Sequence, residues 1–167
     1  MIKVAGFDCS SKNIACVILN EDKKLIKSGF FESKLKSVDL RLVQLIERLD
    51  YNAVFLFFKC EVNYVTIESP IYIQNAKAAL GISQIIGGVK AICARYGIPF
   101  ISVDNKVWKA GTIGHGNATK EEIMKFAIDN WGRENMCNQD ICDAACISLY
   151  GILNYKKAIN FKKWRLI

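Results

Sequence analysis

The sequence has little proline, a single histidine and no long uninterrupted apolar run. Two of its 167 residues are proline, and its seven cysteines include no Cys-x-x-Cys pair. No apolar stretch approaches the ~20 residues of a membrane span, and Asp8 interrupts the N-terminus where a signal peptide would be apolar. These absences argue against a disulfide-bonded secreted domain and against a membrane protein. We expect a protein of a reducing compartment, the cytoplasm.

A zinc site is the alternative use of the cysteines. Cys137, Cys142 and Cys146 could supply three thiolates, but their spacing fits no common zinc pattern and His115 is distant in sequence. Most of the other cysteines lie within apolar runs, where a free thiol behaves as a small apolar side chain. We therefore prefer free thiols to zinc ligands.

The charge of the chain is unevenly distributed. Lys and Arg number 23 against 16 Asp and Glu, which gives a net charge of +7. The length suits one domain, which we place at residues 1–155, followed by a basic tail at 156–167. A basic surplus in one segment favours a polyanionic partner, nucleic acid or anionic lipid. The basic residues of the tail are Lys156, Lys157, Lys162, Lys163 and Arg165.

The hydrophobic pattern predicts an α/β fold with a mixed five-stranded sheet flanked by helices. The first three strands are joined by short polar links, which favours an antiparallel meander. Glycine dominates residues 111–117, which predicts a flexible loop there. The strands are expected at 2–8, 14–19, 25–31, 64–67 and 98–103. The helices are expected after an Asp39 cap and through 54–58, at 75–96 before Gly97, after a Thr119–Glu122 capping box, and at 138–154.

Four carboxylates occur at positions that otherwise lack a partner. Asp8 and Glu68 close two predicted strands, whereas Asp140 and Asp143 share one face of the last helix. That helix is apolar nearly all round, which predicts that it is buried. Buried carboxylates need cations, strong donors or protons, and a divalent ion such as Mg²⁺ or Mn²⁺ is the economical partner.

Three of the four acids also have a purely structural interpretation, and lysines could neutralise the set. Asp140 could cap its helix, Glu68 could be an ordinary loop residue, and Asp8 could organise a turn. Asp104 also follows a strand and competes as a metal ligand, although capping a short helix at 105–109 explains it as well. The four acids taken together favour the metal site.

Four stretches of the chain resemble the RuvC family of Holliday junction resolvases. They are VAGFDCSSKN at 4–13, TIE at 66–68 with Asn75-Ala76, KAGTIG at 109–114 with NATK at 117–120, and DICDAA at 140–145. The resemblance runs through residues 1–155 in order and spacing. It implies an RNase H-like fold, a homodimer, and metal-dependent nicking of four-way DNA junctions.

The same resemblance implies roles for individual residues. Asp8, Glu68, Asp140 and Asp143 would bind metal, and Lys109 and Lys120 would lie near the scissile phosphate. Two Mg²⁺ or Mn²⁺ ions bridged by Asp8 would suit phosphodiester hydrolysis. The aromatic expected soon after the second acid is displaced into Ile71-Tyr72, our candidates for a wedge between unstacked bases. The composition suggests a phage or viral member, acting in the cytoplasm of a bacterium or an infected host cell.

Other function classes remain open on the sequence. A non-catalytic module for branched nucleic acid would use the same basic residues but not four converging acids. A related nuclease could act on flaps, forks or RNA instead of four-way junctions. An actin-like ATPase would need about twice this length. His115, on the glycine-rich loop, could assist proton transfer or be incidental.

Overall fold

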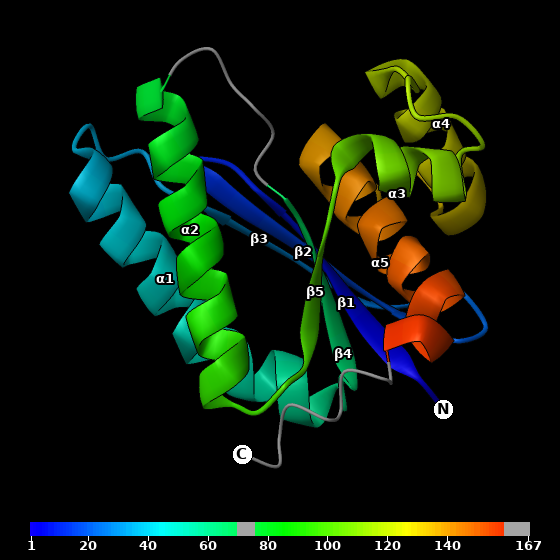
Figure 1. Ribbon diagram of the computed structural model, residues 1–167, viewed down its shortest axis with the longest axis horizontal. Coiled ribbons are helices and arrows are strands. Elements are labelled where there is room, and N and C mark those ends of the chain that lie inside the picture. The colour runs from blue at the N-terminus through cyan, green and yellow to red at the C-terminus, as the bar shows by residue number, and fades with distance from the viewer. Residues whose placement is uncertain (70–75, 159–167) are drawn as a thin grey trace.

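The computed structural model describes residues 1–69 and 76–158, and within them a five-stranded sheet carries helices on both faces (Figure 1). The strand order is β3-β2-β1-β4-β5. β1 to β3 form the predicted antiparallel meander, and β4 and β5 run parallel to β1. The predicted mixed sheet is confirmed. The strands are β1 (Lys3–Cys9), β2 (Asn13–Asn20), β3 (Leu25–Glu32), β4 (Tyr64–Glu68) and β5 (Phe100–Val103).

The helices form one layer on each face of the sheet (Figure 1). One layer holds α1 (Val38–Val54), which continues as a π-helical turn at Phe55–Lys59, and α2 (Ala76–Arg95). Gly97 ends α2 in the left-handed region, at φ 67°, as its position predicted. The other layer holds α3 (Asn105–Thr112), α4 (Lys120–Trp131) and α5 (Gln139–Ala158).

Three element boundaries differ from the sequence-based expectations. The cap of α1 is Ser37, whose side chain accepts from the amide of Leu40, so Asp39 lies inside the first turn. The predicted loop at 111–117 begins later, because α3 continues through Thr112 and its hydroxyl bonds to the carbonyl of Trp108 at 2.7 Å. The last helix reaches Ala158, so its final turn includes the first two lysines assigned to the tail.

Alternation along the strands divides the apolar residues between two cores. Ala5 and Phe7 on β1, and Val65 and Ile67 on β4, pack in the core beneath α1 and α2. Since side chains alternate between the faces of a strand, the intervening positions on β1 and β4 face α5. Those positions are Gly6, Asp8, Thr66 and Glu68.

The backbone of α5 lies directly on the sheet. A methyl group at Gly6 would overlap the carbonyl oxygen of Ala144 and the amide nitrogen of Ser148. One at Gly151 would overlap the hydroxyl of Thr66 and lie 2.7 Å from a methyl carbon of Val4. Glycine at Gly6 on the strand and at Gly151 on the helix therefore permits the close approach of the two backbones. The sequence alone did not reveal this role of Gly6.

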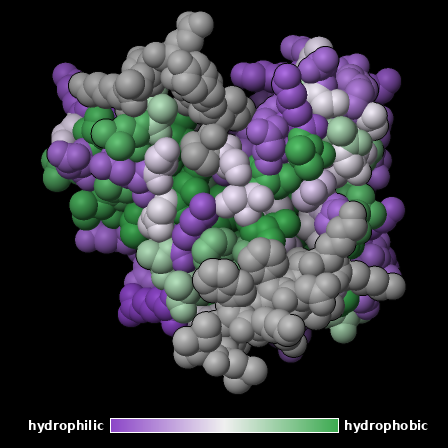
Figure 2. All heavy atoms as spheres, in the orientation of Figure 1, coloured by the Kyte–Doolittle hydropathy of each residue, from purple (hydrophilic) through white to green (hydrophobic). Residues whose placement is uncertain are grey.

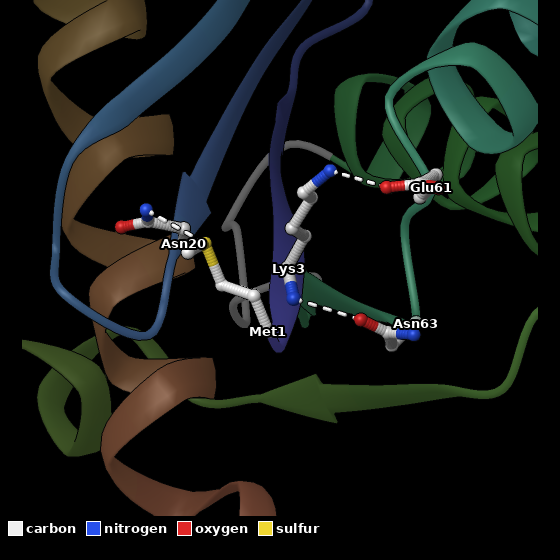
Figure 3. Close-up of polar contacts among 5 residues, drawn as sticks. All are labelled: Met1, Lys3, Asn20, Glu61 and Asn63. Carbon is white, nitrogen blue, oxygen red and sulfur yellow. Dashed lines mark hydrogen bonds and ion pairs between the residues drawn. The ribbon is translucent and has the colours of Figure 1, made fainter.

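Polar contacts fasten the ends of β1 and β4 that lie away from the acids (Figure 3). The amide of Lys3 donates to Oδ1 of Asn63 at 2.8 Å, and its ammonium pairs with Glu61 at 2.7 Å. Nearby, the amide of Asn20 approaches the sulfur of Met1 at 3.2 Å. The two contacts of Lys3 hold the start of β1 against the residues preceding β4, which supports the parallel register of the two strands.

α2 is more apolar than the sequence analysis recognised. The window Ala78–Arg95, with a mean hydropathy of 1.2, is long and apolar enough to cross a membrane by length and composition, the one such window among the described residues. One face of the helix is nevertheless part of the core, through Ile85, Val89 and Cys93. Figure 2 shows hydrophobic residues over the α1 and α2 layer, interspersed with hydrophilic ones.

Candidate active site

The four predicted acids come together where β1, β4 and α5 meet. Asp8 and Glu68 lie at the same ends of two parallel neighbours, because Phe7 pairs with Ile67 in the sheet. Asp140 and Asp143 lie in the first two turns of α5, the helix that packs on β1. All four side chains are partly buried. The sequence prediction that these acids form one cluster agrees with this placement.

The pKa of Asp8 reflects both its burial and the charges of the other three acids. Burial raises its pKa well above the usual value, and the charges of Glu68, Asp143 and Asp140 raise it further. Burial also raises the pKa of Glu68, and it raises that of Asp143 to about 6. Asp8 is therefore the centre of an excess of negative charge.

No ion pair relieves this charge within the described ranges, since none of the recorded pairs includes these acids. The two predicted lysines act from farther away. Lys109 on α3 lowers the pKa of both Glu68 and Asp143, and Lys120 at the start of α4 lowers that of Asp143. Lys109 is partly buried and Lys120 is exposed, so both are near the cluster and able to meet a ligand.

Other residues fill the structural roles considered for Asp8 and Asp140, whereas Asp104 fills its own. The turn after β1 is organised by Ser10, whose amide donates to the carbonyl of Asn13 at 2.9 Å. The start of α5 is capped by Asn138, which accepts from the amide of Ile141 at 2.8 Å, so Asp140 is not the cap. Asp104, the competing ligand, does cap α3, because its carboxylate accepts from the amide of Lys106 at 2.9 Å.

Three carboxamides contact the acids, and sequence reasoning did not find them. Asn105 donates to Oε1 of Glu68 at 2.7 Å and Gln139 to Oδ1 of Asp143 at 2.7 Å. Asn13 donates to Oδ2 of Asp140 at 2.9 Å. Only Gln139 carried a sequence signal, since it lies four residues before Asp143 on one helix face. The other two contacts span 37 and 127 residues.

The cluster fits a hard divalent cation in its chemistry. Its donors are carboxylate oxygens, the ligands that Mg²⁺ and Mn²⁺ prefer, and their charge lacks a paired cation. Across residues 1–69 and 76–158, no three His, Cys, Asp or Glu side chains are already arranged around one point as ligands. The same holds for the zinc alternative, whose Cys137 is exposed while Cys142 and Cys146 are buried. The four acids thus fit a divalent cation by the type of their ligand atoms and by their common location, and they do not form a preformed coordination site.

Other predicted site residues lie apart from the cluster or outside the described residues. His115 contacts Glu122 at 3.6 Å, and both side chains are about half exposed. Ile71, Tyr72, Lys162, Lys163 and Arg165 fall in the ranges 70–75 and 159–167, which the structure does not describe. Lys156 and Lys157 belong to α5, but their side chains are not described.

Comparison with known proteins gives one family. Residues 4–150 match the family described as "Crossover junction endodeoxyribonuclease RuvC". A relative of that description from Aliarcobacter butzleri is 29% identical over 154 residues, covering 89% of this chain and 96% of its own. One from Brachyspira hyodysenteriae is 26% identical over 133 residues, covering 72% and 82%.

The fold agrees with these relationships. The structure is similar to Thermus thermophilus RuvC in complex with a Holliday junction substrate, with a TM-score of 0.79 at 18% identity, over 94% of this chain and 96% of the other. It is also similar to the yeast mitochondrial Holliday junction resolvase Ydc2, with a TM-score of 0.60 at 16% identity, over 98% and 86%. The RNase H-like α/β fold expected from the sequence is confirmed. The chain belongs to the RuvC family of crossover junction endodeoxyribonucleases.

Proposed function

We propose that this chain cuts four-way DNA junctions by metal-dependent hydrolysis of phosphodiester bonds. As a member of its family it is an endonuclease that resolves Holliday junctions. The observation that carries the metal mechanism is the gathering of four carboxylates, Asp8 and the three acids whose charges act on it, without a cationic partner among the described residues. A binding module would gain nothing from this repulsive cluster, which costs stability in the absence of metal.

The residues divide the work of hydrolysis between them. Two Mg²⁺ or Mn²⁺ ions held by the four acids would supply a nucleophilic water and stabilise the leaving 3′ oxygen. The charges of the other three acids raise the pKa of Asp8, and Asp8 is the residue that would bridge the two ions. Lys109 and Lys120 would bind the phosphate and stabilise the charge that develops on its oxygens.

The choice of substrate is tested directly by cleavage. Labelled four-way junction, flap, fork, duplex and RNA–DNA hybrid are incubated with the full chain and Mg²⁺, Mn²⁺ or EDTA. We expect paired nicks in the junction with either metal and none with EDTA. Binding of the junction without cutting under every condition would instead favour a non-catalytic module, and preferred cutting of flaps, forks or the hybrid would favour a related nuclease.

A homodimer suits a substrate with two equivalent strands to cut, because a two-fold protein presents two equivalent sites. We place the interface on α2. Leu80, Gln84, Gly87, Ala91 and Ala94 are exposed and recur at the spacing of a helix–helix seam. Leu80 is 61% exposed, and a side chain at Gly87 would meet nothing within 4 Å. The neighbouring Gly88 serves the monomer instead, since a methyl group there would overlap Ile46 of α1.

Gly87→Arg tests this interface. A long charged side chain at an open surface position should leave the fold intact and separate the subunits, because it would be buried unpaired against the second copy. Light scattering should report a dimer for the wild type and a monomer for the variant. Asn130→Arg on the exposed face of α4 adds the same charge on the opposite layer and should remain dimeric. A dimeric Gly87→Arg protein would exclude α2 as the interface.

The basic tail and the Ile71-Tyr72 pair are proposed to contact DNA. Tyr72 or Ile71 would insert between unstacked bases at the crossover, and an inserted side chain can repay the cost of unstacking. Lys156, Lys157, Lys162, Lys163 and Arg165 would neutralise phosphates, while the aromatic residues between them stack or pack. We expect the protein to act on DNA in the cytoplasm of a bacterium or of an infected host cell.

Truncation after Ala158 tests the tail without cutting into α5. The change removes Lys162, Lys163 and Arg165, so log K for junction binding should depend less steeply on log salt, by up to about 3 units. The rate at saturating protein should persist, because the four acids are upstream. Fluorescence anisotropy between about 50 and 300 mM salt measures the slope. An unchanged slope would leave the tail without a role in phosphate binding.

A further inference from the structure

We infer that Asn13, Asn105 and Gln139 are positioning residues that orient the outer three acids for metal binding. The inference rests on the proposed function, and it adds residues to which the family resemblance assigns no role, although Asn13 lies within one of the quoted stretches. Each amide donates one hydrogen bond to one oxygen of one carboxylate, at 2.7 to 2.9 Å. Among the described residues no side-chain amide donates to Asp8, which accepts instead from the backbone of its neighbour Cys9.

Asn105 sits on a helix that is firmly held. It is the first residue of α3, whose N-terminus is capped by Asp104 and whose Trp108 is fully buried. The indole nitrogen of Trp108 makes no hydrogen bond within the described residues, yet it lowers the pKa of Glu68. Glu68 therefore accepts a hydrogen bond from Asn105 of α3, and a second donor of the same helix, the indole nitrogen of Trp108, lies near it.

Asn13 joins the turn after β1 to α5. Its Oδ1 accepts from the hydroxyl of Ser10, which orients the opposite end of the amide, Nδ2, toward Asp140. Gln139 makes its contact within α5, where residues four apart are neighbours on the helix surface. The three amides thus come from three different elements, and each is directed at a different acid.

A neutral amide suits this task better than a lysine would. A lysine paired with each acid would cancel the charge that attracts the ion and would compete with it for the carboxylate. An amide engages one oxygen, leaves the other available, and leaves the charge of the carboxylate in place. Hydrogen-bonded partners of this kind set the orientation of metal ligands, and their loss typically reduces metal affinity by about 10–100-fold.

Mn²⁺ titration of the metal-free full-length chain, without DNA, tests the inference. Asn105→Ala, Gln139→Ala and Asn13→Ala should each raise the Mn²⁺ dissociation constant by about 10–100-fold, measured by electron paramagnetic resonance or calorimetry. Asn105→Gln keeps a donor and should stay within about threefold of the wild type. Asn130→Ala is the matched control, because that amide bonds to a backbone carbonyl on exposed α4 and should leave binding unchanged.

Cleavage supplies the second measurement. The Mg²⁺ concentration for half-maximal rate should rise in the alanine variants by a factor similar to that of Mn²⁺ binding, with the rate recovering at saturating metal. Wild-type Mn²⁺ affinity in all three variants would overturn the inference, as would unfolding detected by circular dichroism, since that would make the amides structural. A wild-type chain that binds no Mn²⁺ and cuts no junction would instead refute the proposed function.

Discussion

Asp8→Asn is expected to abolish junction cleavage and, at the same time, to stabilise the metal-free protein. Cleavage should fall by at least about 10³-fold, because the substitution removes the carboxylate on which the charges of the other three acids act and the proposed bridge between the ions. Stability should rise because the variant no longer buries the charge that Glu68, Asp140 and Asp143 repel. A gain of about 1 kcal/mol would raise the Tm by about 2–4 °C in a domain of this size.

The expected pH dependence follows from the direction of the pKa shifts. Asp8, Glu68 and Asp143 all have pKa values above the ordinary range, and that of Asp143 is about 6. Between about pH 4 and pH 6 the folded chain therefore binds more protons than the unfolded chain, so stability falls as pH rises through this window. Thermal melts in EDTA should show this decline in the wild type and a shallower one in Asp8→Asn.

Asp104→Asn is the matched control. Asp104 is exposed and caps α3, and asparagine is an equally good cap, so neither cleavage nor stability should change much. Addition of Mg²⁺ should raise the Tm of the wild type and of this control but not of Asp8→Asn. Loss of folded structure in Asp8→Asn, seen by circular dichroism, would show that the carboxylate supports the fold instead of a metal.

Gly6→Ala is expected to have the largest effect on stability of any single methyl group added to the sheet. The new methyl group would overlap backbone atoms of Ala144 and Ser148, which cannot rotate away as a side chain can. The helix would have to move off β1, and we expect a loss of about 3 kcal/mol or more, the upper end of overpacking costs. Chemical denaturation at neutral pH measures the loss.

The same displacement should reach the active site. Gly6 and Asp8 face α5 from alternate positions of β1, so moving α5 away from Gly6 also moves Asp140 and Asp143 away from Asp8. We expect reduced cleavage and weaker Mn²⁺ binding even at temperatures where the variant is folded. Gly29→Ala is the control in another strand, because its methyl group would lie 3.6 Å from the ring of Phe31, an ordinary contact. Equal stability of the two variants would contradict the close-approach argument.

The local sequence pattern was sufficient to predict most of the helices and strands. Short apolar runs separated by polar links placed the three strands of the meander, and the Thr119–Glu122 capping box placed the start of α4, because both signals involve residues close in sequence. The prediction of a helix boundary failed where two nearby residues could both serve as the N-terminal cap. Ser37 and Asp39 are both good caps, and the sequence did not show which one the helix uses. The sequence shows no uninterrupted apolar run near 20 residues, because Ser83, Gln84 and Lys90 lie within α2, although the helix as a whole is apolar.

The sequence by itself predicted the four acids of the site, at the ends of two strands and on one face of a buried helix, whereas the resemblance to the family added Lys109 and Lys120. The sequence could do so because burying a carboxylate is costly enough to stand out in an apolar context. Tertiary structure alone decided which oxygen of each acid is hydrogen-bonded, and by which amide. Asn13 and Asp140 are 127 residues apart, and no local rule links them. The tertiary structure also decided the role of Gly6, because a side chain at this position becomes unfavourable only when α5 lies against β1.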